Sequence, residues 1–141
     1  MPETGESDDS RWEYTLSVPN DPRAVTICRR ALRLILTLHG LPHLAEVAEL
    51  VATELVTNAV QHTEGPAAIR LRWARGVLRV GVWDADPTPP DPARPGALDE
   101  RGRGLALVQD CANGWGWHLL GRAQDPRGTG KFIWCELTTA A

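Results

Sequence analysis

Apolar and polar residues alternate at the start of the chain, where Trp12, Tyr14, Leu16 and Val18 occupy every second position. A period of two is typical of a β-strand with one buried face, so residues 12–18 are predicted to form a strand. The same pattern predicts four later strands, at residues 68–73, 77–83, 115–120 and 132–137.

The apolar period changes to that of a helix in two segments between the first and second strands. The first begins after the turn at residues 19–22 and ends at Gly40 and Pro42. Its expected buried positions are Ala24, Ile27, Cys28, Ala31, Ile35 and Leu38. The second runs from about Leu44 to His62, and its expected buried positions are Val47, Leu50, Val51, Leu55 and Ala59.

The remaining segments complete a single-domain plan. Residues 84–103 are rich in Pro and Gly, and a loop of this length is usually functional or mobile. A short helix is predicted from Gly104 to Cys111. The order of elements predicts an α/β (α+β two-layer) fold, with a mixed, mostly antiparallel sheet and helices on one face. Residues 11–138 are expected to form one domain, and residues 1–10 a disordered acidic tail.

The composition of the chain limits the classes of partner and the cellular compartments that can be expected. The formal net charge is −3 and Lys131 is the only lysine, so clustered basic charge for direct nucleic-acid binding is not expected. Three cysteines without close pairing suggest free thiols rather than a disulfide framework. No apolar stretch is long enough to cross a membrane, and the first residues lack the pattern of a signal peptide. A cytoplasmic location is therefore expected.

The second helix carries a row of polar side chains that could bind a metal ion or take part in catalysis. Glu54 and Asn58 are four residues apart, and His62 extends the row by another turn of the same face. This row is expected to face a cleft or solvent. An Asn oxygen is a suitable ligand for magnesium, and a Glu can deprotonate or orient an attacking hydroxyl. A solvated helix face is the ordinary alternative for such a pair.

Three further segments offer weaker signals. Asp84 ends a strand, where its carboxylate would accept a hydrogen bond from an exocyclic amine, although an Asp that starts a turn is common. The segment Gly102-Arg103-Gly104 precedes a predicted helix, whose first N–H groups would hold phosphate oxygens. The segment from Gly128 to Lys131 lacks the spacing of a nucleoside-triphosphate loop and is interpreted as a hairpin turn, with Thr129 near a nucleotide.

Taken in order, residues 54–62, 82–86 and 102–108 resemble the three ATP-binding boxes of the superfamily that groups gyrase, the Hsp90 chaperone, histidine kinases and the mismatch-repair protein MutL. Together with residues 130–137, the chain looks most like the stand-alone bacterial branch of anti-sigma factors that are also serine/threonine-protein kinases. The resemblance spans residues 12–137 and implies a Bergerat-type ATP-binding fold.

The resemblance also implies roles for individual residues. Asn58 matches the magnesium-binding Asn, Glu54 the general base, and Asp84 the carboxylate that binds the adenine amino group. The implied cofactors are ATP and Mg²⁺. The nucleotide-binding residues implied by the resemblance, in which His62 and Thr129 are the looser matches, are Asn58, His62, Asp84, Asp86, Gly102, Arg103, Gly104, Leu105 and Thr129.

The same resemblance implies partners: a sigma factor, an anti-anti-sigma protein whose serine is phosphorylated, and a second copy of the chain in a homodimer. The chain departs from the superfamily at the second box, where Asp86 and Thr88 replace the glycines of Asp-x-Gly-x-Gly. Two interpretations of a nucleotide site therefore stay open. One is an ATP-dependent serine kinase that regulates transcription. The other is an ATP-dependent protein-binding switch without phosphotransfer.

Overall fold

The computed structural model of the chain describes residues 11–62, 65–86, 113–120 and 130–138. These residues form an α+β structure with a five-stranded sheet in the order β1-β2-β3-β5-β4. The strands are β1 (Trp12–Val18), β2 (Ala67–Ala74), β3 (Val77–Asp84), β4 (Gly114–Leu120) and β5 (Gly130–Thr138). Every pair of neighbouring strands in this sheet is antiparallel, which confirms the predicted fold class and makes it more specific.

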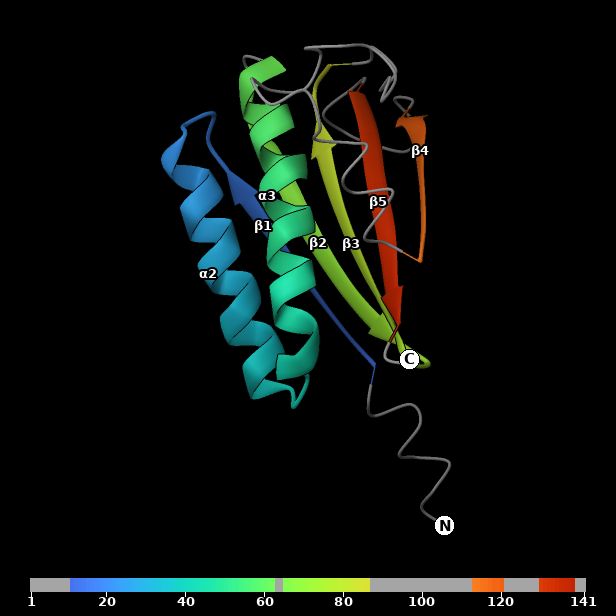
Figure 1. Cartoon of the computed structure of the whole chain (residues 1–141). Helices are drawn as coiled ribbons and strands as arrows, with labels where there is room; N and C mark the ends of the chain where they lie inside the picture. The colour runs from blue at the N-terminus through green and yellow to red at the C-terminus, as the bar shows by residue number, and fades with distance from the viewer. Residues whose placement is uncertain (1–10, 63–64, 87–112, 121–129, 139–141) are drawn as a thin grey trace.

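Two helices lie side by side on one face of the sheet (Figure 1). They are α2 (Arg23–Leu38) and α3 (Ala45–His62), and the short 3₁₀ helix η1 (Pro42–Leu44) connects them. Within the described ranges, neither helix is both long and apolar enough to span a membrane. Because α3 packs on β2, β3 and β5, it is the helix that covers the middle of the sheet.

The buried faces of both helices differ in part from the predicted ones. Helix α2 buries Ala24, Cys28, Leu32 and Leu36, whereas Ile27 and Leu38 are 55% and 75% exposed. These buried residues of α2 are four apart and form a narrower stripe than the one predicted, and α2 packs mainly against α3. In α3 the predicted Val47 and Leu50 are also exposed, and the small residues Ala45, Ala48 and Ala52 are buried instead.

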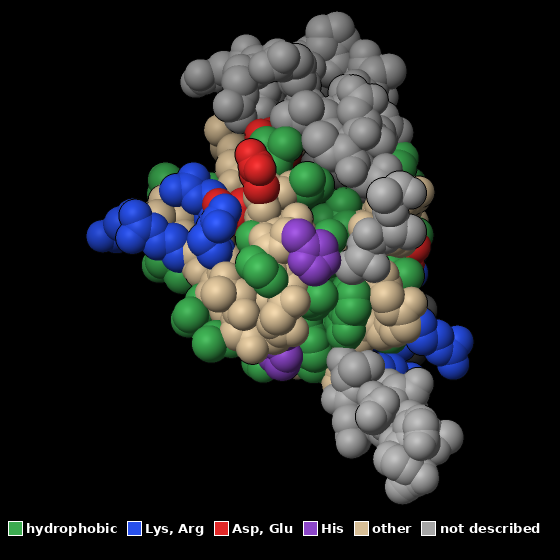
Figure 2. All heavy atoms as spheres, turned by 60° about the horizontal axis from the view of Figure 1, so that its bottom comes forward, with side chains coloured by type: hydrophobic (Ala, Val, Ile, Leu, Met, Phe, Trp, Pro, Cys, Tyr) green, Lys and Arg blue, Asp and Glu red, His purple; other side chains and the backbone are tan. Residues whose placement is uncertain are grey.

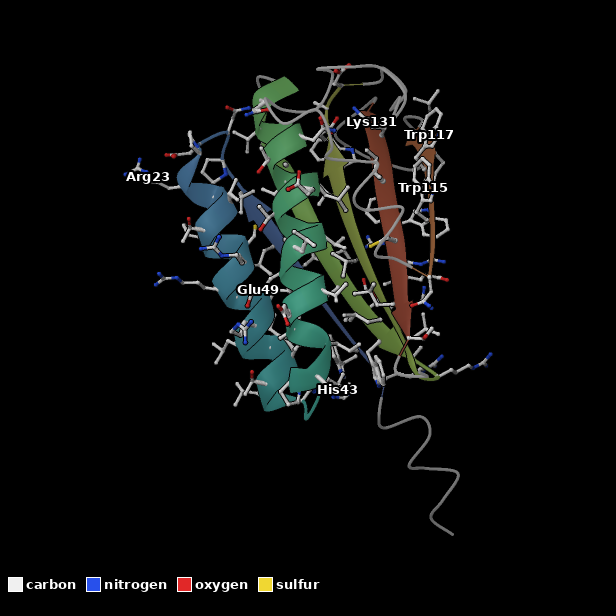
Figure 3. All side chains as sticks on the ribbon, in the orientation of Figure 1. Arg23, His43, Glu49, Trp115, Trp117 and Lys131 are labelled. Atoms are coloured by element: carbon white, nitrogen blue, oxygen red, sulfur yellow. The ribbon has the colours of Figure 1, made fainter. Side chains whose placement is uncertain are left out.

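Ion pairs connect the two helices on the outer side of the helical layer. Arg29 and Arg33 of α2 pair with Glu49 of α3, the Arg29 contact measuring 4.0 Å between Nε and Oε1. Figure 2 shows basic side chains gathered beside acidic ones on one side of the molecule, and Figure 3 places Glu49 between α2 and α3. Part of this basic surface is therefore neutralised within the chain.

No helix among the described residues covers the opposite face of the sheet, where aromatic rings lie on glycines. The Phe132 ring lies over Gly81, and the Trp134 ring lies over Gly116, so closely that a Cβ at either glycine would collide with the ring. The guanidinium of Arg79 stacks on Trp134, 4.2 Å from the ring centroid, and forms an ion pair with Glu136 at 2.6 Å. Aromatic rings thus fill the space that the glycines leave on this face.

Candidate nucleotide-binding site

The described residues include four buried side chains that are polar or charged. Their relative exposures are 6% for Glu54, 9% for Asn58, 2% for Asp84 and 4% for Lys131. Burying such groups costs free energy unless they are partnered, so a folded chain retains few of them without a structural or functional reason. Three of the four are site residues predicted from the sequence.

Glu54 and Asn58 lie one turn apart in the second half of α3, among core residues that include Leu55 and Ala59. Their burial differs from the expectation that this row faces a cleft or solvent. The helix that carries these side chains packs against the sheet and against α2. Chemical groups on this part of the helix are therefore set in a largely dry environment.

The end of α3 is fixed next to the end of β3. Asn20 donates hydrogen bonds from Nδ2 to the backbone oxygens of Val60, at 3.1 Å, and Gly65, at 3.5 Å. Gly65 in turn lies against Ala85, since a Cβ built at Gly65 would be 3.6 Å from the Ala85 Cβ. The chain leaving α3 and the chain leaving β3 therefore meet at one end of the sheet, the end at which β5 begins (Figure 1).

At this end Asp84 and Lys131 form a buried ion pair. The two residues are direct partners in the antiparallel register of β3 and β5, and Lys131 Nζ lies 3.0 Å from Asp84 Oδ1. The Lys131 ammonium also donates to the backbone oxygen of Asp86 at 2.9 Å, and the Asp86 N–H donates to the same Asp84 Oδ1 at 2.9 Å. Figure 3 shows Lys131 at the end of β5 beside the end of β3.

The environment of Asp84 acts on its protonation in two directions. Burial raises the pKa of the carboxyl above its ordinary value, whereas the charge and hydrogen bond of Lys131 lower the pKa. Both hydrogen bonds to this carboxylate reach Oδ1, and no group in the described ranges donates to Oδ2. Asp84 therefore presents one oxygen that can accept a hydrogen bond from a ligand.

A close approach of the backbone accompanies this pair. A Cβ at Gly130 would collide with the backbone oxygen of Asp84 and would also press on the Trp83 indole. Only glycine leaves room there, so β5 can lie against β3 where Lys131 reaches Asp84.

Lys131 is the residue that the sequence analysis missed, because residues 128–131 were interpreted as a hairpin turn. The signal that would have revealed it is its spacing of two from Ile133, Cys135 and Leu137, which places it on the helix-covered face. It is also the only lysine of the chain. A lone lysine in phase with a buried apolar row indicates a buried partner.

Several predicted residues lie outside the described ranges. His62 is the last residue of α3, but its side chain is not described. Asp86 lies in the described region and contributes its backbone N–H and oxygen to the Asp84 turn. The residues wholly outside, together with the predicted helix at 104–111 and the tail at 1–10, are Gly102, Arg103, Gly104, Leu105 and Thr129.

Comparison with known proteins places this site in a family context. The sequence profile described as "Histidine kinase-like ATPase domain" matches residues 18–123, more than half of the chain. This range contains Glu54, Asn58 and Asp84 and ends before Lys131. The chain is also similar to an uncharacterised protein of Streptomyces coelicolor, with 40% identity over 90 residues that cover 60% of this chain and 78% of that protein.

Proposed function

Since the chain belongs to the histidine kinase-like ATPase domain family, we propose that it binds Mg-ATP at the end of the sheet where α3, β3 and β5 meet. The observation that carries this proposal is the burial of Glu54, Asn58 and Asp84, with an acceptor oxygen of Asp84 left available to a ligand. These three residues are the ones that the family resemblance assigns to base, metal and adenine.

The chemistry of Asp84 fits an adenine ring. An ionised carboxylate is only an acceptor of hydrogen bonds, and the exocyclic amine of adenine is a donor. In a buried setting such a bond discriminates strongly, because a ligand without the donor leaves the carboxylate unsatisfied. Asp84 would bind the amine through Oδ2, while Lys131 and the Asp86 N–H hold Oδ1.

The chemistry of α3 fits a magnesium-bound phosphate. Magnesium typically keeps several waters and takes few protein ligands beside substrate phosphates. Asn58 would supply its amide oxygen, and when bound the ion neutralises phosphate charge. Among the described residues no cluster of three His, Cys, Asp or Glu is present, so such an ion would depend on the nucleotide for much of its coordination.

The finer proposal is that the protein is an anti-sigma factor with serine/threonine-protein kinase activity toward an anti-anti-sigma partner. Glu54 lies one helical turn from Asn58 and would accept the proton of the attacking serine hydroxyl. The protein would bind a sigma factor in its nucleotide-loaded form and act as a homodimer in the cytoplasm. These partners and this activity come from the resemblance stated above.

Nucleotide binding is tested by titrating Mg-ATP into wild type, Asp84→Asn and the control Glu136→Gln. Glu136 is a carboxylate of the same sheet on its open face. We expect wild type and Glu136→Gln to bind equally, and Asp84→Asn to bind at least about tenfold more weakly. Wild-type protein that binds no ATP would contradict the proposed function.

Phosphotransfer is tested separately with Glu54→Gln and the control Glu46→Gln, an exposed carboxylate in the first turn of the same helix. Each is incubated with labelled ATP and candidate anti-anti-sigma proteins. We expect Glu54→Gln to keep ATP affinity and to lose phosphoserine formation by a factor of about 10² or more. ATP binding by wild type without any phosphoserine would instead support the nucleotide-dependent binding switch.

A further inference from the structure

In the proposed function Lys131 enters so far only as a hydrogen-bond donor to Asp84 Oδ1, although it is the most unusual residue of this end of the sheet. It is the only lysine in the chain, and its side chain is 4% exposed. An ammonium in such a place needs partners, because removing the charge from water costs several kcal/mol. Its two partners are Asp84 Oδ1 and the backbone oxygen of Asp86.

These two bonds restrict how Asp84 can be used. Lys131 joins the Asp84 side chain to the backbone two residues later, so the turn after β3 is closed around the ammonium. Oδ1 is then occupied by Lys131 and by the Asp86 N–H, and Oδ2 is the oxygen that remains for a ligand. The register partner on β5 thus determines which carboxylate oxygen a ligand meets.

We propose that Lys131 is a positioning and specificity-determining residue: it keeps Asp84 ionised and orients Oδ2, so that the site accepts a purine carrying an amino group and rejects one carrying a carbonyl oxygen there. This inference rests on the proposed function, because it assigns the base selectivity of the same site. The ligand class is an adenine nucleotide, and the rejected class is a hypoxanthine nucleotide.

The electrostatic reason lies in the groups that face Asp84. Burial and the charge of Asp86 both raise the pKa of the Asp84 carboxyl, and the described residues supply Lys131 as the cation that lowers this pKa. Helix α3, which packs on β3, contributes the buried carboxyl of Glu54, and its last residue, His62, is the only residue of its second half that can become a cation. Without Lys131, Asp84 would therefore take up a proton at a higher pH.

A protonated Asp84 would have different selectivity. A carboxylic acid donates one hydrogen bond, so it satisfies the carbonyl oxygen of hypoxanthine, whereas a carboxylate repels that oxygen. Loss of Lys131 should therefore weaken ATP binding and reduce the preference for ATP over ITP. Both changes should reverse as the pH rises and Asp84 ionises again.

The test measures dissociation constants of Mg-ATP and Mg-ITP from pH 6 to pH 8 for wild type, Lys131→Met, Lys131→Arg and Arg79→Met. Arg79→Met removes a cation from the other face of the same strand pair and serves as the control. We expect Lys131→Met to lower the ATP/ITP preference about tenfold or more at low pH, with recovery toward high pH. Lys131→Arg should retain most of the preference, and Arg79→Met all of it.

A second measurement needs no variant. Labelling with ¹⁵N-lysine gives a single side-chain Nζ signal, because the chain has one lysine. We expect this signal to shift on saturation with Mg-ATP. ATP binding by wild type that leaves the Nζ signal unmoved, or a Lys131→Met variant that keeps the wild-type ATP/ITP ratio at every pH, would overturn the inference alone. Wild type that binds neither nucleotide would overturn the proposed function and the inference with it.

Discussion

Strands β3 and β5 carry two ion pairs that have the same register relation and opposite surroundings. Asp84 pairs with Lys131 at 3.0 Å on the helix-covered face, where the side chains are 3% and 4% exposed. Arg79 pairs with Glu136 at 2.6 Å on the open face, where the side chains are 38% and 33% exposed. The shorter contact is the more exposed one, and water can replace it. The distance alone therefore does not show which pair contributes more to stability.

The difference shows that an ion pair between β3 and β5 has a different role on each face of the sheet. On the open face, solvent screens the charges, and Arg79 gains part of its support from the Trp134 ring beneath it. On the covered face, each charge depends on the other, because neither is well solvated. The Arg79–Glu136 pair is thus part of the solvent-exposed surface. The Asp84–Lys131 pair instead controls the ionisation of a carboxyl that we propose to bind a ligand.

The largest expected effect comes from removing one member of each pair. Lys131→Met should lower the free energy of unfolding by about 3 kcal/mol or more at pH 7, because it leaves a buried carboxyl without its counter-ion. Glu136→Gln should lower it by less than about 1 kcal/mol. Urea unfolding followed by Trp fluorescence measures both values. Equal losses would show that burial does not distinguish the pairs.

The glycines beside the two pairs provide a second, smaller contrast. Gly130→Ala forces a Cβ against the backbone oxygen of Asp84, which cannot retreat without disturbing the β3–β5 ladder, so we expect a loss of about 2 kcal/mol. At Gly81 the new Cβ meets the half-buried Phe132 ring, which can tilt toward solvent, so we expect about 1 kcal/mol. Thermal unfolding of the two variants ranks them. A larger loss for Gly81→Ala would mean that the open face is the more rigid one.

The smallest expected effect is the response to salt. Double-mutant cycles isolate the coupling between the members of each pair. In 1 M NaCl the Arg79–Glu136 coupling should fall by a few tenths of a kcal/mol, since screening acts within about 3 Å at that ionic strength. The Asp84–Lys131 coupling should change less. A larger salt-induced change in the Asp84–Lys131 coupling than in the Arg79–Glu136 coupling would contradict the contrast between the two pairs.

The sequence predicts local features of this molecule well, because local features follow from the period of apolar residues. All five described strands and both long helices were predicted, and Glu54, Asn58 and Asp84 were selected from their positions in those elements. The predicted buried positions failed at Ile27 and Val47, because periodicity does not say how wide a stripe the neighbouring layer covers.

Features that depend on register were not predicted. The partnership of Asp84 with Lys131 joins residues far apart in the sequence, and it exists only because β3 and β5 align as they do. The fit of Trp134 over Gly116 has the same origin, since that ring and that glycine belong to different strands. Spacing along one segment carries no information about such alignments.

The burial of Lys131 also affects how the folded protein meets reagents and enzymes that modify lysine. The chain has one lysine side chain, and the fold encloses its amine. An acylating probe, or an enzyme that attaches a tag to lysine, would reach this amine only when this end of the sheet opens. The rate of lysine acylation would therefore report the opening of this end of the sheet, and a nucleotide that binds there would slow the reaction.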